Sequence, residues 1–184
     1  MGLLLPGTTI EVGSYANQTA DYVLSNIFAA GGIVLSQMST LTGLEAYTIQ
    51  NWVKRGFLPP PVHRQYSRRQ FTRVVIINML KDSMKIDQVI KLLTYINGAM
   101  NREDDDTIED PMLYHLFVNL LGQLEGEFPS REALRDACDK VLLDFHETVA
   151  HSRERIRTVL MVMVYAWLST RSKQQAELLM RDMM

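Results

Sequence analysis

The sequence predicts an all-α protein, in which a helix-turn-helix domain is followed by an α-helical C-terminal bundle. Apolar residues recur at three- and four-residue spacings along most of the 184-residue chain, the repeat of helices with one buried face. Residues 130–184 contain neither glycine nor proline, so nothing interrupts long helices there. Apolar residues make up 47% of the chain, which is enough for a packed core, and the 22% of charged residues argues against disorder.

Cysteine content and apolar run length bear on where the protein resides. One cysteine excludes a disulfide framework and is typical of a reducing compartment. The longest apolar run, Val159 to Leu168, is ten residues, about half of what a membrane-spanning helix needs. No basic region precedes the opening MGLLLPG, so we expect no signal peptide. These features predict a cytoplasmic protein without a membrane partner.

Residues 1–32 are expected to form an N-terminal arm and one helix. Residues 1–14 show no clear period, which predicts an irregular segment. Apolar residues on one side of Thr19–Ala30 predict a helix that Gly31-Gly32 ends. Ile33-Val34 then predicts a short extended segment.

Residues 35–66 predict two short helices joined by a tight turn. Gly43 and Leu44 form the turn, and the second helix is expected over residues 45–55. Gly56 ends that helix, and the prolines at 59–61 prevent its resumption, since proline lacks the amide hydrogen. Two short helices joined by a glycine-containing turn are the sequence form of a helix-turn-helix unit.

The exposed side of the second helix carries residues that can contact DNA. Burial of Ile49, Trp52 and Val53 turns outward Tyr47, Gln50, Asn51 and Lys54. Glutamine and asparagine amides can pair with adenine N6 and N7, worth about 1–3 kcal/mol of base discrimination. Lys54 and Arg55 are placed to reach phosphates. Amphipathicity by itself nevertheless favours an ordinary solvated face.

Charge is distributed unevenly along the chain. Residues 35–91 hold nine basic and three acidic side chains, a net charge of +6. Residues 92–150 hold four basic and thirteen acidic ones, a net charge of −9. A basic segment beside an acidic one is typical of a DNA-binding module joined to a module that does not bind DNA, and chance clustering is the alternative.

A set of residues in 35–96 occurs in a recognisable order: Leu35, Met38, Leu41-Thr42-Gly43-Leu44, Thr48-Ile49, Trp52, Lys54, Gly56, Leu58-Pro59-Pro60, Arg64, Tyr66-Ser67 and the apolar run after Phe71. This segment resembles the DNA-binding domain of the MerR family of bacterial transcriptional regulators. The chain is more closely similar to an uncharacterised bacterial family of MerR-like helix-turn-helix proteins with a helical C-terminal region, whose function is unassigned.

The resemblance implies a recognition helix in the major groove of double-stranded DNA. Base contacts are expected from Tyr47, Gln50 and Asn51. Phosphate contacts are expected from Thr48, Lys54, Arg55, Arg64, Tyr66, Arg68 and Arg69. MerR regulators usually carry an arginine in place of Gln50 and an aromatic residue in place of Asn51, which implies that a different sequence is bound, or is bound less tightly. The wing should be minimal or absent, because only Val62 and His63 separate the prolines from Arg64.

Two further helices complete the domain predicted for residues 33–97. Ser67 and Gln70 predict a capping box that opens a helix to about Lys81, and a helix at about 86–96 follows. Arg68 and Arg69 lie in a first turn, where the helix dipole disfavours cations, which fits a bound phosphate as well as it fits exposed arginines.

Residues 98–109 predict an acidic linker, and residues 110–184 a helical dimerisation or effector region. The linker's clustered aspartates lack the calcium-loop pattern. Asp110 as cap and Pro111 at the first position predict a helix to Gly126, and Pro129-Ser130 opens another with apolar residues as far as Val149. Breaks are expected near 151–152 and near 169–170.

Chemistry-bearing residues in the C-terminal region are sparse. Cys138 and the histidines His115, His146 and His151 form no close pair, so we expect no metal site and no cofactor. The methionines and aromatic residues fit core packing best, with a pocket for a small apolar effector or a dimer interface as alternatives.

The sequence therefore predicts a DNA-binding transcriptional regulator. A homodimer is expected, because one short recognition helix contacts few bases. The alternative is a protein-interaction module built on a helix-turn-helix scaffold. We expect no enzyme, since the sequence shows no nucleophile with a nearby base and no phosphate loop.

Overall fold

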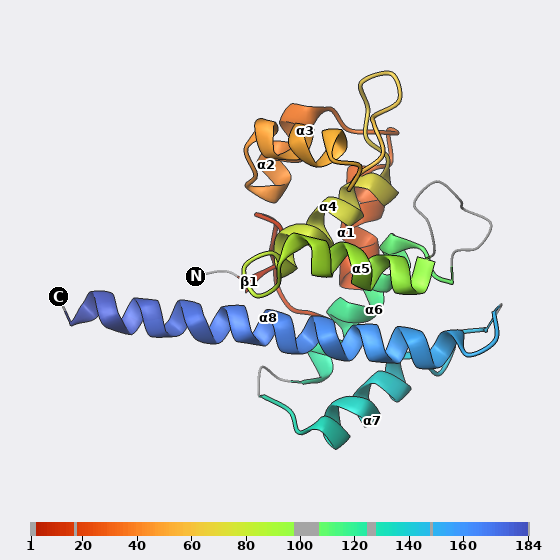
Figure 1. Cartoon of the computed structure of the whole chain (residues 1–184), viewed down its shortest axis with the longest axis vertical. Helices are drawn as coiled ribbons and strands as arrows, with labels where there is room; N and C mark the ends of the chain where they lie inside the picture. The colour runs from red at the N-terminus through yellow and green to blue at the C-terminus, as the bar shows by residue number, and fades with distance from the viewer. Residues whose placement is uncertain (1–2, 17, 98–106, 125–127, 148, 184) are drawn as a thin grey trace.

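The computed structural model describes residues 3–16, 18–97, 107–124, 128–147 and 149–183. Within these residues the chain forms a two-stranded sheet and eight helices (Figure 1). In chain order they are β1 (Leu3–Leu4), β2 (Glu11–Val12), α1 (Thr19–Ile27), α2 (Leu35–Thr42), α3 (Ala46–Lys54), α4 (Arg68–Leu80), α5 (Ile86–Asn97), α6 (Asp110–Gln123), α7 (Arg131–Val141) and α8 (Ser152–Asp182). The mostly helical class predicted from the sequence is confirmed.

Helices α4 and α6 lie at the centre of the molecule. Helix α6 packs against α1, α4, α7 and α8, and α8 also contacts α4 and α5. Helices α2 and α3 pack against each other and reach α4 through α2, at the end of the molecule away from α7 and α8 (Figure 1). Buried side chains from β1 to α8 form one hydrophobic core, so the α2–α3 pair is fixed to the same core as the C-terminal helices.

Helix α4 is more deeply buried than its sequence suggests. The pattern predicts an amphipathic helix with a single apolar stripe, but residues 70–77 are buried all round. The helix begins as expected, with Ser67 Oγ accepting from the Gln70 amide and Gln70 Oε1 accepting from the Ser67 amide. The predicted capping box is therefore confirmed.

The buried charge on α4 is neutralised by α6. Arg73, 5% exposed, donates from Nε to Asp110 Oδ2 at 2.8 Å and from its Nη2 to Oδ1 at 3.4 Å. Asn97 Nδ2 lies 3.5 Å from the same Oδ1. The prediction that Asp110 caps α6 is wrong, since the cap position is Glu109 and Asp110 lies in the first turn. Its carboxylate pairs with Arg73 instead.

The N-terminal segment is more regular than predicted. Residues 1–14 were expected to be irregular, yet β1 and β2 pair antiparallel, with Leu3 opposite Val12. The loop between them contacts the end of α2, where the Thr9 amide donates to Leu41 O. Asn78 Nδ2 donates to both Gly7 O and Thr42 O, which connects this hairpin, α2 and α4. Two-residue strands are too short for a period to appear in the sequence.

The C-terminal helices differ from expectation in their ends. Helix α7 begins at the predicted Ser130 cap but ends at Val141, so Phe145 and Val149 lie outside it. The break near residues 151–152 is present, but none occurs near 169–170, and α8 runs unbroken for 31 residues. No helix in the part of the chain that the structure describes is both long and apolar enough to span a bilayer.

Helix packing crosses the domain boundaries predicted from the sequence. Helix α6 lies against α1 on one side and α4 on the other, so the predicted N-terminal, central and C-terminal segments share contacts. Most of the predicted acidic linker, residues 98–106, lies outside the described residues.

Candidate nucleic-acid interface

Helices α2 and α3 are joined by a tight turn that glycine makes possible. Gly43 ends α2 with φ of +69°, in the left-handed region that side chains disfavour, and its amide donates to Ser39 O. Thr42 Oγ1 donates to Met38 O and accepts from the Leu44 amide, which fixes the direction of the chain into α3. The turn predicted at Gly43-Leu44 is present.

Helix α3 is anchored by its apolar side and exposes its polar side. Ile49 is fully buried and Trp52 is 4% exposed. Tyr47 is 76% exposed, and Gln50 and Lys54 are also exposed. The remaining predicted contacts on this helix, Thr48 and Asn51, are half-buried. The side chains expected to touch DNA therefore lie largely on the accessible side of α3.

A minimal hairpin follows α3. Val62 and Gln65 pair antiparallel through reciprocal backbone hydrogen bonds of 3.0 and 2.9 Å. Both residues between them, His63 and Arg64, have positive φ, which is the conformation of a two-residue type I′ turn. Figure 1 shows this hairpin projecting at the same end of the molecule as α3. Arg64 is exposed at its tip.

Gln70 fixes the base of the hairpin to α4. Its Nε2 donates to the carbonyl oxygens of Pro59 and Pro60, both at 2.9 Å, while its Oε1 serves the capping box. The side chain is 9% exposed, so these hydrogen bonds are shielded from water. One amide thus joins the segment after α3 to the start of α4.

Tyr66, unlike the other residues expected to contact phosphates near the hairpin, is buried. Its side chain is 3% exposed, and its backbone pairs with Ile33 through hydrogen bonds of 2.7 and 3.0 Å. The structure therefore does not support the phosphate contact predicted for Tyr66, because the ring packs in the core. The pairing also confirms the extended segment predicted at Ile33.

Several cations between residues 54 and 73, Arg55, Arg68 and Arg73 among them, are paired with carboxylates of the chain. Arg73 is buried against Asp110, and Arg68 Nη2 lies 2.6 Å from Asp21 Oδ1. Arg55 lies 3.7 Å from Asp87 at the surface and stacks over the Phe57 ring at 4.3 Å. The positive field at this end of the molecule is consequently weaker than the sequence count implies.

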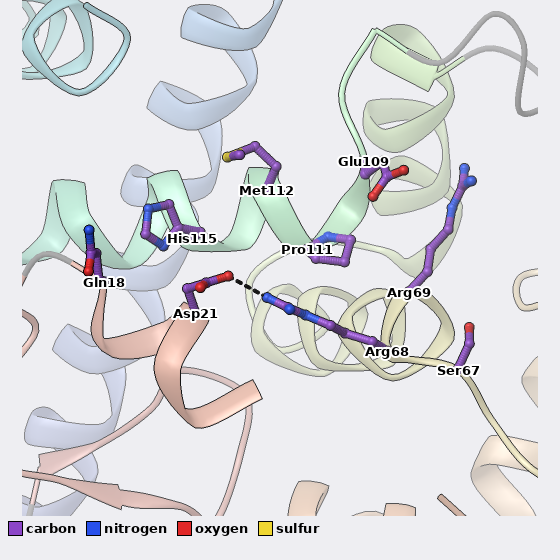
Figure 2. A pocket seen from close by; sticks show the side chains of 9 residues that line it. All are labelled: Gln18, Asp21, Ser67, Arg68, Arg69, Glu109, Pro111, Met112 and His115. Atoms are coloured by element: carbon purple, nitrogen blue, oxygen red, sulfur yellow. Dashed lines mark hydrogen bonds and ion pairs between the residues drawn. The ribbon is translucent and has the colours of Figure 1, made fainter. Parts of the chain in front are cut away.

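A cleft of about 770 Å³ is lined by residues of α1, of the start of α4 and of the start of α6. Figure 2 shows Arg68 extending across it to Asp21 of α1, with His115 of α6 beyond. Arg69 and Glu109 also line this cleft. The expected phosphate contact of Arg68 is not supported, because its guanidinium is engaged by Asp21 and by Ser25 Oγ. Helix α1, which the MerR resemblance does not include, supplies that carboxylate.

Burial makes His115 a weaker base. Its pKa is lowered mainly by burial, opposed by the charge of Asp21 and reinforced by that of Arg68. Its Nε2 lies 3.0 Å from Asn119 Nδ2. No group of three or more histidine, cysteine or acidic side chains among the described residues is arranged to hold a metal ion.

Two features of this region were not predicted from the sequence. His63 is exposed at the hairpin tip. The feature that could have indicated this position is the two-residue turn between Val62 and Gln65. The Asp21–Arg68 ion pair joins residues 47 apart, which no local pattern indicates.

A protein-family model described as "Domain of unknown function (DUF1836)" matches residues 12–117. The chain belongs to this family. The matched region extends from β2 into α6, so it includes α1 and both partners of the Arg73–Asp110 pair as well as the α2–α3 unit. No curated protein and no solved structure matches the chain. The family description assigns no activity or ligand.

Proposed function

We propose that this DUF1836 protein is a non-catalytic transcriptional regulator that binds double-stranded DNA in a sequence-specific manner through a MerR-like helix-turn-helix. The observation that carries the proposal is the exposure of Tyr47, Gln50 and Lys54 on α3, at the end of the molecule remote from the C-terminal helices. Packing of these side chains beneath α6–α8 would have removed the basis for DNA binding.

The dimensions of α3 suit a major groove. Nine residues at 1.5 Å each give a helix of about 14 Å, and the groove is about 12 Å wide. In the proposed complex Tyr47, Gln50 and Asn51 contact base edges. Phosphate contacts come from Thr48, Lys54, Arg55, Arg64 and Arg69. Arg55 exchanges its exposed 3.7 Å contact with Asp87 for a phosphate, at little cost because exposed ion pairs are weak.

A homodimer is part of the proposal. One α3 contacts only a few base pairs, and two helices about 34–36 Å apart would occupy successive major grooves. The last turns of α8 support self-association, since they expose Leu179 at 65%, Met180 at 61% and Met183 at 84%. Met183, the cap residue of α8, lies four residues after Leu179 and three after Met180, which is the spacing of one helix face.

The test begins with selection of bound duplexes from a random pool, followed by fluorescence anisotropy with the selected duplex. Gln50→Ala with Asn51→Ala should reduce the preference for the selected duplex over a scrambled one by about tenfold or more. Gln175→Ala, on the exposed tail of α8, is the matched control and should leave that preference unchanged. An unchanged preference in the double variant would show that α3 does not contact bases.

Salt dependence tests the phosphate contacts separately. The logarithm of the binding constant should fall with the logarithm of salt concentration by about 0.9 per phosphate contact. Lys54→Gln should reduce that slope by about one contact per protomer, whereas Lys173→Gln on α8 should not change it. Equal slopes for both variants would show that Lys54 makes no phosphate contact.

The competing proposal is a protein-interaction module on the same scaffold. Neutralisation of Arg55, Arg68 and Arg73 within the chain favours it, since it removes cations that DNA binding would use. This alternative predicts no selected duplex even at low salt, together with capture of a protein partner that Tyr47→Ala and Gln50→Ala abolish and Gln175→Ala does not.

A further inference from the structure

A hollow of about 390 Å³ lies between the N-terminal hairpin, α6 and α8. None of the residues that line it belongs to the α2–α3 unit. Its apolar lining comes from three elements: Leu3 of β1, Leu121 and the following Leu124 at the end of α6, and Trp167 and Leu168 of α8. The volume falls in the range of small-molecule sites. Leu121 and Leu168, 5% and 6% exposed, belong to the core, so the floor of the hollow is rigid.

The aromatic wall is held in place by other rings. Trp167 meets Tyr15 edge-on at 6.5 Å between centroids and Phe117 edge-on at 6.4 Å. Such pairs restrict ring rotation and add about 0.5–1.5 kcal/mol each. Tyr15 is in turn fixed by its hydroxyl, which donates to Leu4 O at 2.6 Å. The wall therefore exists before any ligand arrives.

Gly122 allows the segment after β2 to lie directly against α6 at Tyr15. A Cβ at this helical position would overlap the Tyr15 carbonyl oxygen. Glycine inside a helix costs about 1 kcal/mol relative to alanine, so its presence here accompanies a specific close approach. That approach closes one side of the hollow.

Among the described residues that line the hollow, Arg171 alone carries a formal charge. Its guanidinium lies 4.8 Å from the Trp167 ring centroid, and among the described residues no carboxylate lies within ion-pair distance of it. An arginine held over an aromatic ring at the edge of an apolar hollow presents its N–H groups for a carboxylate. A neutral or cationic ligand would make no use of it.

We propose that this hollow binds a small apolar monocarboxylate, with its carboxylate on Arg171 and its hydrocarbon part against Trp167 and the leucines. The site is independent of the DNA-binding proposal, because none of its lining residues belongs to α2, α3 or the hairpin at residues 62–65.

The experiment titrates the full chain with decanoate, following Trp emission and the heat of binding. Trp52 is 4% exposed on α3 and contributes a constant background, so a saturable change reports Trp167. Uncharged 1-decanol is the matched ligand. Arg171→Gln should weaken decanoate binding by about tenfold and leave decanol binding unchanged. Arg181→Gln removes the same charge ten residues further along α8 and should change neither.

A second variant tests the location by adding charge. Ser14 is exposed at the rim, so Ser14→Asp should also weaken decanoate binding without affecting decanol or the thermal midpoint. The proposal is overturned if decanoate produces no saturable signal, if Arg171→Gln and Arg181→Gln weaken it equally, or if decanol loses affinity in parallel with decanoate.

Discussion

The buried ion pair between α4 and α6 gives the sharpest stability prediction. The Arg73 side chain is 7% exposed and that of Asp110 is fully buried, so water cannot replace either partner. Removal of one partner from a buried pair costs about 3–5 kcal/mol, because the remaining charge stays in the core. Asp110→Asn keeps one acceptor for Arg73 and should lower the free energy of unfolding by about 3 kcal/mol. Arg73→Met leaves the carboxylate with the 3.5 Å contact to Asn97 and should approach 5 kcal/mol.

Replacing both partners should cost less than replacing either one. Arg73→Met with Asp110→Leu leaves no buried charge, and comparable replacements are often neutral or stabilising. Loss of an acidic residue from the first turn of α6 still costs about 0.3–1 kcal/mol through the helix dipole. Urea unfolding of the four proteins of a double-mutant cycle measures the coupling energy between Arg73 and Asp110, provided that the slope m is similar in all four.

The control for this cycle is the partly exposed pair of Arg157 with Asp139, 20% and 44% exposed. Asp139→Asn should cost no more than about 1 kcal/mol. The reasoning from burial would be refuted if the single replacements of Arg73 and Asp110 each cost less than about 1 kcal/mol. It would also be refuted if the two costs were additive in the double variant.

Three further predictions concern glycine, cysteine and histidine. Gly122→Ala should lower the free energy of unfolding by about 1–3 kcal/mol despite its better helix propensity, because its Cβ would overlap Tyr15; Gly13→Ala, which meets nothing within 4 Å, should be near neutral in the same denaturation assay. Burial, reinforced by Asp139 and opposed by Arg157, raises the pKa of the Cys138 thiol to about 12, so at pH 8 about one molecule in ten thousand carries a thiolate. Labelling by a disulfide reagent should then follow unfolding, and rapid labelling of the native protein would contradict this. Because the pKa of His115 is lowered by folding, the unfolded chain binds a proton first as pH falls. The contribution of His115 to the free energy of unfolding is therefore present above the usual pKa of 6.5 and is lost below it. His115→Gln should therefore flatten the decline of stability between about pH 7 and 5, and parallel curves would count against it.

Local sequence patterns were sufficient to predict one interhelical turn and two helix N-caps. The glycine turn after α2, the Ser67–Gln70 capping box and the Ser130 cap each depend on residues within a few positions of one another. Stereochemistry and short-range hydrogen bonding decide such features, so they can be recognised in a sequence.

Element ends and charge pairing were harder to predict. Nothing between Val141 and Ser152 prohibits a helix by composition, yet α7 ends there, and Arg153 then donates to the carbonyl oxygens of Leu142 and Phe145. The segment is held by a side chain from the next helix. A search for glycine and proline could not reveal that.

The sequence by itself determined the helical class, the α2-turn-α3 unit and the polar side of α3, because each follows from spacing along one segment. Only the tertiary structure decided which cations remain at the surface and which residues line a hollow. Arg68 and Arg73 are neutralised by Asp21 and Asp110, 47 and 37 residues away, and Arg171 lines the same hollow as Leu3 of β1. Chain folding alone brings such groups together, since electrostatic and apolar contacts depend on distance in space.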